Sequence, residues 1–209
     1  MLKGGSTQAV AGRLRGKKRW SGAMRWAAPL LGIAVLAGFG VLAYLRQHHQ
    51  EQAEQAAGIY AEVMDTLRQG QAIQALSHAG RLIEQYSGRP EASLAALATA
   101  PAALALQSHK AASTQLHFAV AHARDQGIMA DARLQLARLS WNDGQLQAAL
   151  EVLKDPPKGF EAQFLALRGD VFLAQGRDRA AREAWSQALQ YTKDPGLRSE
   201  IQQKKAVWP

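Results

Sequence analysis

The sequence predicts an all-α protein, in which one N-terminal transmembrane helix is followed by a domain of stacked helical hairpins. Two observations lead to this fold class. Residues 26–45 form an apolar run that contains no charged residue and no histidine. After residue 46, apolar residues recur at helical spacing in segments of roughly 12–16 residues that end at Gly or Pro turns. We find no segment with the alternation typical of a strand.

The apolar run, WAAPLLGIAVLAGFGVLAYL, is long enough to cross a bilayer. As a helix it would rise about 30 Å, the thickness of the hydrocarbon core. Trp26 and Tyr44 lie near its two ends, as aromatic residues do at membrane interfaces. The run exceeds the apolar part of a signal peptide, which is about 7–15 residues, and no small-residue cleavage site follows it. We therefore expect residues 26–45 to be a permanent transmembrane helix.

The positive charge lies before this run. The chain has 25 Lys and Arg against 17 Asp and Glu, and seven of the basic residues, with no acidic residue, fall within residues 1–25. By the positive-inside rule the N-terminus is cytoplasmic and residues 46–209 lie outside. We expect residues 1–25 to be a disordered cytoplasmic tail that attracts anionic lipid headgroups of the membrane, at about 1 kcal/mol per charge. The remaining domain is nearly neutral, which argues against a nucleic-acid partner, although a nucleic-acid arm is an alternative for the tail.

Small residues recur along the predicted membrane helix. Ala28, Gly32 and Gly40 are separated by multiples of four residues, so they share a helix face that would let a partner helix approach closely. The alternative is that Gly and Ala are simply common in membrane helices.

From residue 46 onward, apolar residues at helical spacing predict a series of helices that end at turn signals. The first continues from the membrane span and ends at Gly70. Pro101 removes a backbone donor and clashes with the preceding turn, so we expect a kink or a break in the third. Gly127 is expected to end the fourth. These four helices are predicted over residues 47–68, 72–85, 91–107 and 111–124.

The second half of the domain has the same organisation. Asp194-Pro195 is typical of an N-cap followed by proline at the first helical position, and it opens a short final helix. Lys204 and Lys205 near the end of that helix suit its dipole. The other helices are predicted over residues 128–141, 146–153, 160–175 and 177–191, with turns or linkers at residues 142–144, 155–159 and 176.

The hairpins share a repeated pattern. Phe118, Leu153 and Trp185 occupy corresponding places at separations of 35 and 32 residues, close to the period of about 34 residues of tetratricopeptide repeats. Small residues and turn glycines of that repeat fall at matching offsets, and a generic helical bundle is the alternative. In the last pair the pattern comprises Gly169, Phe172, Gly176, Ala181, Trp185 and Ala188, and in the middle pair Ala137, Gly144, Ala149 and Leu153.

The chain resembles the YfgM family, most specifically in residues 167–189, LRGDVFLAQGRDRAAREAWSQAL. The resemblance covers nearly all of the chain after residue 25. It implies an ancillary subunit of the SecYEG translocon with a periplasmic tetratricopeptide-repeat-like domain over residues 46–209. The implied partners are the translocon and a membrane-anchored periplasmic chaperone of the parvulin-like type, and the implied role is transfer of secreted proteins to periplasmic chaperones. The alternative is a membrane-tethered regulator that acts through its basic cytoplasmic tail.

The residues predict no catalytic, metal or cofactor site. The chain has no cysteine, no nucleotide-binding or hydrolase motif, and no His pair at i, i+4. We therefore expect a protein-binding scaffold and not an enzyme.

If the domain binds proteins, the groove lined by the first helix of each hairpin is the expected surface. Arg138, Trp141, Asn142 and Asp170 are the candidate groove residues, because aromatic anchors and charged groups are typical of binding sites. The alternative for Trp141 is a core role between helices. The same offsets place Asp131, Leu134, Gln163, Ala166 and Leu173 in the groove.

Overall fold

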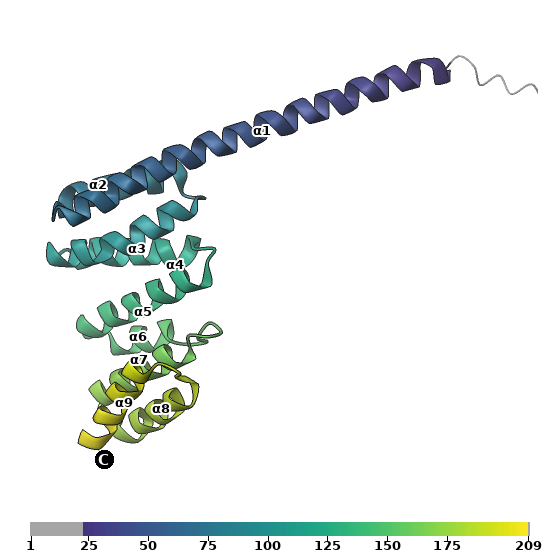
Figure 1. Ribbon diagram of the computed structural model, residues 1–209. Coiled ribbons are helices and arrows are strands. Elements are labelled where there is room, and N and C mark those ends of the chain that lie inside the picture. The colour runs from purple at the N-terminus through teal and green to yellow at the C-terminus, as the bar shows by residue number, and fades with distance from the viewer. Residues whose placement is uncertain (1–22, 209) are drawn as a thin grey trace, which may run out of the picture. The chain divides into compact units, whose positions relative to one another are not determined.

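The computed structural model describes the backbone of residues 23–208 and the side chains of residues 40–208. This part of the chain contains nine α-helices and no strand (Figure 1). The chain divides into two units, Met1–Gln50 and Glu51–Pro209. The helices are α1 (Ala23–Arg68), α2 (Ala72–Tyr86), α3 (Pro90–Ala105), α4 (His109–His122), α5 (Gln126–Asn142), α6 (Leu146–Val152), α7 (Glu161–Ala174), α8 (Asp178–Tyr191) and α9 (Pro195–Val207).

The first unit contains the N-terminal part of α1. The backbone of residues 26–45 is helical and continues without a break to Arg68, as the sequence predicted. The large apolar side chains of Val41, Leu42, Tyr44 and Leu45 are exposed. Among the residues that the structure describes, no helix has the length and apolar character needed to cross a membrane. Residues 1–22 and the side chains of residues 23–39, which include most of the predicted span, lie outside the described part.

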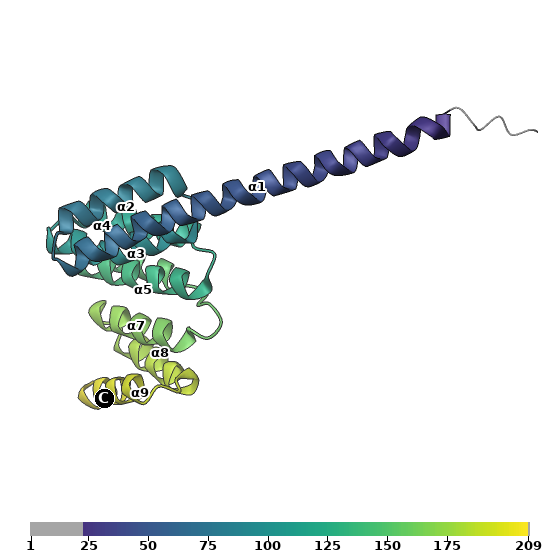
Figure 2. The ribbon, with the colours of Figure 1, turned by 45° about the horizontal axis from the view of Figure 1, so that its top comes forward.

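The second unit is a stack of antiparallel helical hairpins. After the hairpin of α1 and α2, the pairs α3–α4, α5–α6 and α7–α8 follow in chain order (Figure 1), and α9 packs at the end (Figure 2). Buried residues of successive helices form the core, as where Val63 of α1, Leu82 of α2 and Ala95 of α3 belong to one cluster. Alanine is the commonest buried residue, and its small side chain allows the helices to approach closely.

The turns and caps follow from local sequence. Gly144 and Gly176 have φ angles of 74° and 71°, a left-handed conformation that glycine adopts without steric cost, and both lie at the predicted turns. The predicted N-cap Asp194 is confirmed, because its carboxylate accepts a hydrogen bond from the backbone N–H of Gly196 at 2.9 Å.

Two details of the prediction differ from the structure. The expected break at Pro101 is absent, since α3 continues through this residue to Ala105; Pro101 is exposed and has no backbone N–H to donate. Gly127 does not end a helix either, because α4 ends at His122. Gly127 lies in the first turn of α5, where the side chain of Asp125 accepts hydrogen bonds from the N–H groups of Gly127 and Ile128 at 2.8 and 3.0 Å.

Candidate protein-binding site

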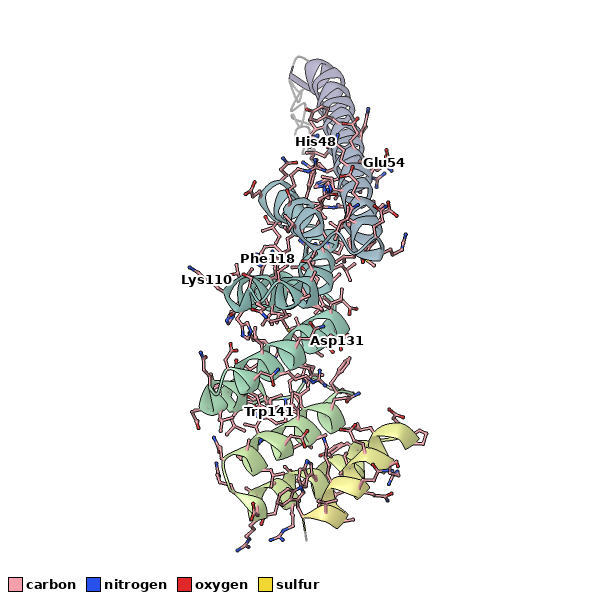
Figure 3. The ribbon with its side chains drawn as sticks, turned by 90° about the vertical axis from the view of Figure 1, so that its left-hand side faces the viewer. His48, Glu54, Lys110, Phe118, Asp131 and Trp141 are labelled. Carbon is pink, nitrogen blue, oxygen red and sulfur yellow. The ribbon has the colours of Figure 1, made fainter. Side chains whose placement is uncertain are left out.

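A pocket of about 320 Å³ opens near the C-terminal end of the helical stack. Four helices contribute to its wall, and most of the lining side chains are apolar. The half-buried Trp141 of α5 packs against a core cluster that includes Phe164 and Val171 of α7, and it lies between the α5 and α7 ribbons (Figure 3). The pocket is lined by Trp141, Asp170, Leu173, Ala174, Trp185, Lys204 and Trp208.

Trp185 of α8 is the deepest residue of the wall, with no exposed surface. Its indole N–H donates to the backbone carbonyl of Ala166 at 3.1 Å and to Asp170 Oδ1 at 3.0 Å. The indole lies directly against the backbone of Gly169, where no larger residue would fit without a shift. These contacts hold the ring in one orientation and join α8 to α7.

Asp170 also joins α7 to α9. Its second oxygen, Oδ2, accepts a hydrogen bond from Lys204 Nζ at 2.7 Å, and the same ammonium donates to Glu200 Oε1 at 2.7 Å. Burial lowers the pKa of Lys204, but the hydrogen bonds with the Asp170 and Glu200 carboxylates outweigh burial and raise it above its ordinary value. Lys204 is therefore a charged group that is already shared between two carboxylates.

Residues 17–206 match the family model of the tetratricopeptide repeat-like domain. The chain belongs to this family. It is 27% identical over 148 residues to the ancillary SecYEG translocon subunit of Haemophilus influenzae, a match that covers 70% of this chain and 72% of that relative. It is 34% identical over 95 residues to the ancillary SecYEG translocon subunit of Escherichia coli, which covers 45% of this chain and 46% of that relative. The resemblance to the YfgM family is thereby confirmed.

A solved structure of pilF from Pseudomonas aeruginosa has the same fold. Its TM-score to this chain is 0.55 at 15% sequence identity, over 75% of this chain and 71% of that structure. The all-helical repeat predicted from the sequence is thus confirmed both by the family model and by the arrangement of the helices.

Within the tetratricopeptide repeat-like domain, the structure brings together some of the predicted groove residues. Trp141, Asp170 and Leu173 line one pocket although they come from two helices. Trp141 also packs on the core, as its alternative role predicted, and its role as a binding anchor stays a prediction. Arg138 and Asn142 are exposed on α5 and do not line the pocket.

Two other residues that the repeat offset predicts in the groove are buried instead. Leu134 and Ala166 have only 5% and 6% of their surface exposed and belong to core clusters of the tetratricopeptide repeat-like domain. The repeat offset places them on the groove side of α5 and α7, but neighbouring helices cover them. Asp131 and Gln163 are exposed, as predicted.

The predicted packing face of the membrane helix falls almost wholly outside the described residues. The side chains at Ala28 and Gly32 are not described. Gly40 is described, and a Cβ added there would meet no atom within 4 Å. A partner for this face remains a prediction.

Four residues of the pocket were not singled out as site residues from the sequence: Ala174, Trp185, Lys204 and Trp208. Trp185 was recognised as part of the repeat, and Lys204 as a complement to the helix dipole. The missing information was the return of α9 against α7. A large aromatic residue directly after a final helix, as Trp208 is, was the available signal.

The described residues contain no cluster of potential metal ligands. Across residues 40–208, no three His, Asp or Glu side chains gather closely enough to hold an ion. His109 Nδ1 of α4 lies 2.5 Å from Asp143 Oδ1 at the end of α5. This pair has no third ligand among the described residues.

Proposed function

We propose that this chain is a non-catalytic scaffold that is anchored in the bacterial inner membrane and associates with the SecYEG translocon. The observation that carries the proposal is its similarity to two relatives that both bear the name ancillary SecYEG translocon subunit. The helical repeats support it, because such stacks present an extended surface that binds proteins.

The anchor in this proposal is the helix of residues 26–45, with the N-terminus in the cytoplasm and residues 46–209 in the periplasm. The seven positive charges before it and the exposed apolar side chains of residues 41–45 support this topology. The basic tail would then lie on anionic headgroups of the inner membrane.

The periplasmic domain would receive secreted proteins as they leave the translocon and pass them to periplasmic chaperones, among them a membrane-anchored chaperone of the parvulin-like type. An anchor beside the exit raises the effective concentration of the domain there, so weak contacts with clients suffice. The groove residues Arg138, Trp141, Asn142 and Asp170 are the proposed client contacts.

Topology is tested by fusing alkaline phosphatase or a cytoplasm-dependent fluorescent protein after Pro209. The proposal expects phosphatase activity and no fluorescence. Fluorescence without phosphatase activity would overturn the periplasmic placement.

The partner is tested with photo-crosslinking residues placed at Arg138 and Asn142, two exposed positions on α5. Arg179 on α8, whose side chain is 89% exposed, provides a control position on the second helix of a hairpin. The proposal expects translocon subunits or chaperones to crosslink from α5 more strongly than from Arg179. Crosslinks that arise only from residues 1–25 would instead support the alternative, a regulator acting through its basic tail.

A further inference from the structure

We propose that the pocket between Trp141, Asp170 and Trp208 binds an uncharged apolar side chain from an internal segment of an unfolded polypeptide, and does not bind a free C-terminus. This inference rests on the proposed function and specifies its client. It depends on the size of the pocket, the apolar character of its wall, and the way its charges are paired.

The size suits a side chain of this kind. A volume of about 320 Å³ is at the lower end of the range for ligand pockets, about 300–1,000 Å³. Five of the seven lining residues are Trp, Leu or Ala. Trp208 is 49% exposed and Trp141 is half-buried, so ring surface remains for a ligand to cover.

The charges argue against a free carboxylate. Both oxygens of Asp170 already accept hydrogen bonds, from Trp185 and from Lys204. Lys204 already donates to two carboxylates, those of Asp170 and Glu200. A free C-terminus would bring a third carboxylate to one ammonium, and repulsion among the three would oppose binding. An amide-linked internal segment brings no such charge.

The wall is held in place before any ligand arrives. Gly169 and the two hydrogen bonds of Trp185 fix the buried indole, and the ion pair between Asp170 and Lys204 fixes α9 beside α7. A preformed apolar surface binds with a smaller loss of side-chain entropy than one that must first become ordered. A translocating chain presents internal apolar side chains throughout its passage but presents its C-terminus only at the end, so the selectivity matches the proposed client.

The test uses the full chain in lipid nanodiscs and a fluorescein-labelled peptide, SGLWLGS, with both ends capped. Binding is followed by fluorescence anisotropy. Ala174→Phe fills the pocket from an exposed position at the last residue of α7. Ala105→Phe is the matched control, because Ala105 is an exposed alanine at the last residue of α3 and does not line the pocket.

The proposal expects the capped peptide to bind the wild type, and a version with serine at the three apolar positions to bind at least tenfold more weakly. Ala174→Phe should weaken binding of the capped apolar peptide by about tenfold or more, and Ala105→Phe should leave it unchanged. Equal binding by the two variants would overturn the pocket as the site. Tighter binding of an otherwise identical peptide with a free C-terminus would overturn the selectivity.

A second pair of variants keeps the test valid if Ala174→Phe does not fold. Trp208→Ala removes part of the wall, and Tyr191→Ala removes a comparably exposed aromatic residue, 57% against 49%, from the end of α8. Only Trp208→Ala should weaken binding of the capped apolar peptide. Peptide binding without any translocon crosslink would overturn the proposed function and support the pocket as a peptide site. A translocon crosslink without peptide binding would support the proposed function and overturn the pocket as a peptide site.

Discussion

The backbone of Gly169 on α7 lies directly against the indole of Trp185 on α8. A Cβ added to Gly169 would be 2.4 Å from both Cδ1 and Nε1 of the ring, which is closer than a Cβ approaches a non-bonded heavy atom. The tryptophan is fully buried and hydrogen-bonded, so it has no space into which to retreat. This contact sets how closely the last helical hairpin can pack, and it explains why a glycine and a large aromatic residue occur together in the repeat pattern.

Gly169→Ala should therefore destabilise the protein by about 1–3 kcal/mol, the usual cost of overpacking a core. Gly80 on α2 provides the control, because a Cβ added there would meet no atom within 4 Å. Gly80→Ala should stabilise by about 0.5–1 kcal/mol through the better helix propensity of alanine. Urea unfolding followed by circular dichroism measures both. Changes of the same sign would contradict the structural explanation.

The raised pKa of Lys204 predicts that the free energy of unfolding depends on pH. Hydrogen bonds with Asp170 and Glu200 outweigh burial and raise its pKa above the ordinary value of 10.5, so the folded state holds this proton more tightly than the unfolded chain. The resulting stabilisation is fully present below pH 10.5 and is lost as the pH rises through the folded-state pKa.

The difference in free energy of unfolding between the wild type and Lys204→Met should accordingly shrink as the pH is raised above 10.5. Lys193→Met is the control, because Lys193 is exposed in the turn before α9 and makes no such junction. A difference for Lys204→Met that stays constant with pH would contradict the assignment.

Arg133 ties α5 to the segment after α6. Its guanidinium donates to the carbonyl of Val152 from Nε at 3.1 Å and from Nη2 at 2.8 Å, and also to the carbonyls of Lys154 and Asp155. These carbonyls belong to the end of a helix and to the linker, where the backbone has few other partners. The side chain fixes the turn between the third and fourth hairpins.

Arg133→Lys keeps the charge but loses the planar fork, so we expect a loss of about 1.5–3 kcal/mol in unfolding free energy. Faster amide hydrogen exchange across residues 153–160 should accompany it. Arg138→Lys on the same helix is exposed and should change stability by less than about 0.5 kcal/mol. Similar losses for the two variants would show that the carbonyl contacts of Arg133 are unimportant.

Two prolines in α3 should respond in opposite directions. Pro101 is inside the helix and exposed, so Pro101→Ala restores a backbone hydrogen bond. Alanine also gives the unfolded chain more conformational freedom, which opposes this gain, so the free energy of unfolding should rise by about 1–2 kcal/mol. Pro90 is the first helical residue, where proline fits, and Pro90→Ala should lower stability by about 0.4–1 kcal/mol. Thermal unfolding distinguishes them, and a loss for Pro101→Ala would refute the first estimate.

Most of the fold could be predicted because the signals for helices in this chain are local. Apolar spacing located α1 to α8 to within a few residues, and the Asp194-Pro195 signal located the start of α9. Gly144, Gly176 and Asp194 marked turns and a cap that depend on their own backbone geometry. The errors arose where tertiary packing or a neighbouring cap competes with propensity. The helix α3 continues through the exposed Pro101. Asp125 caps α5, so Gly127 lies in the first turn of that helix.

The site could be predicted only in part. The repeat offset identified Trp141 and Asp170, because the first helix of each hairpin is an element with a fixed periodicity. It misassigned Leu134 and Ala166, since burial depends on which neighbouring helix covers a face and not on the spacing within one helix.

The sequence alone therefore determined the helical class, the repeat and the concentration of positive charge before residues 26–45, because propensity, periodicity and charge are properties of short segments. The tertiary structure decided how α9 returns against α7. That return pairs Lys204 with Asp170 across 34 residues of chain and adds Trp208 to the wall of the pocket. Such a contact depends on the packing of separate helices, which no local pattern encodes.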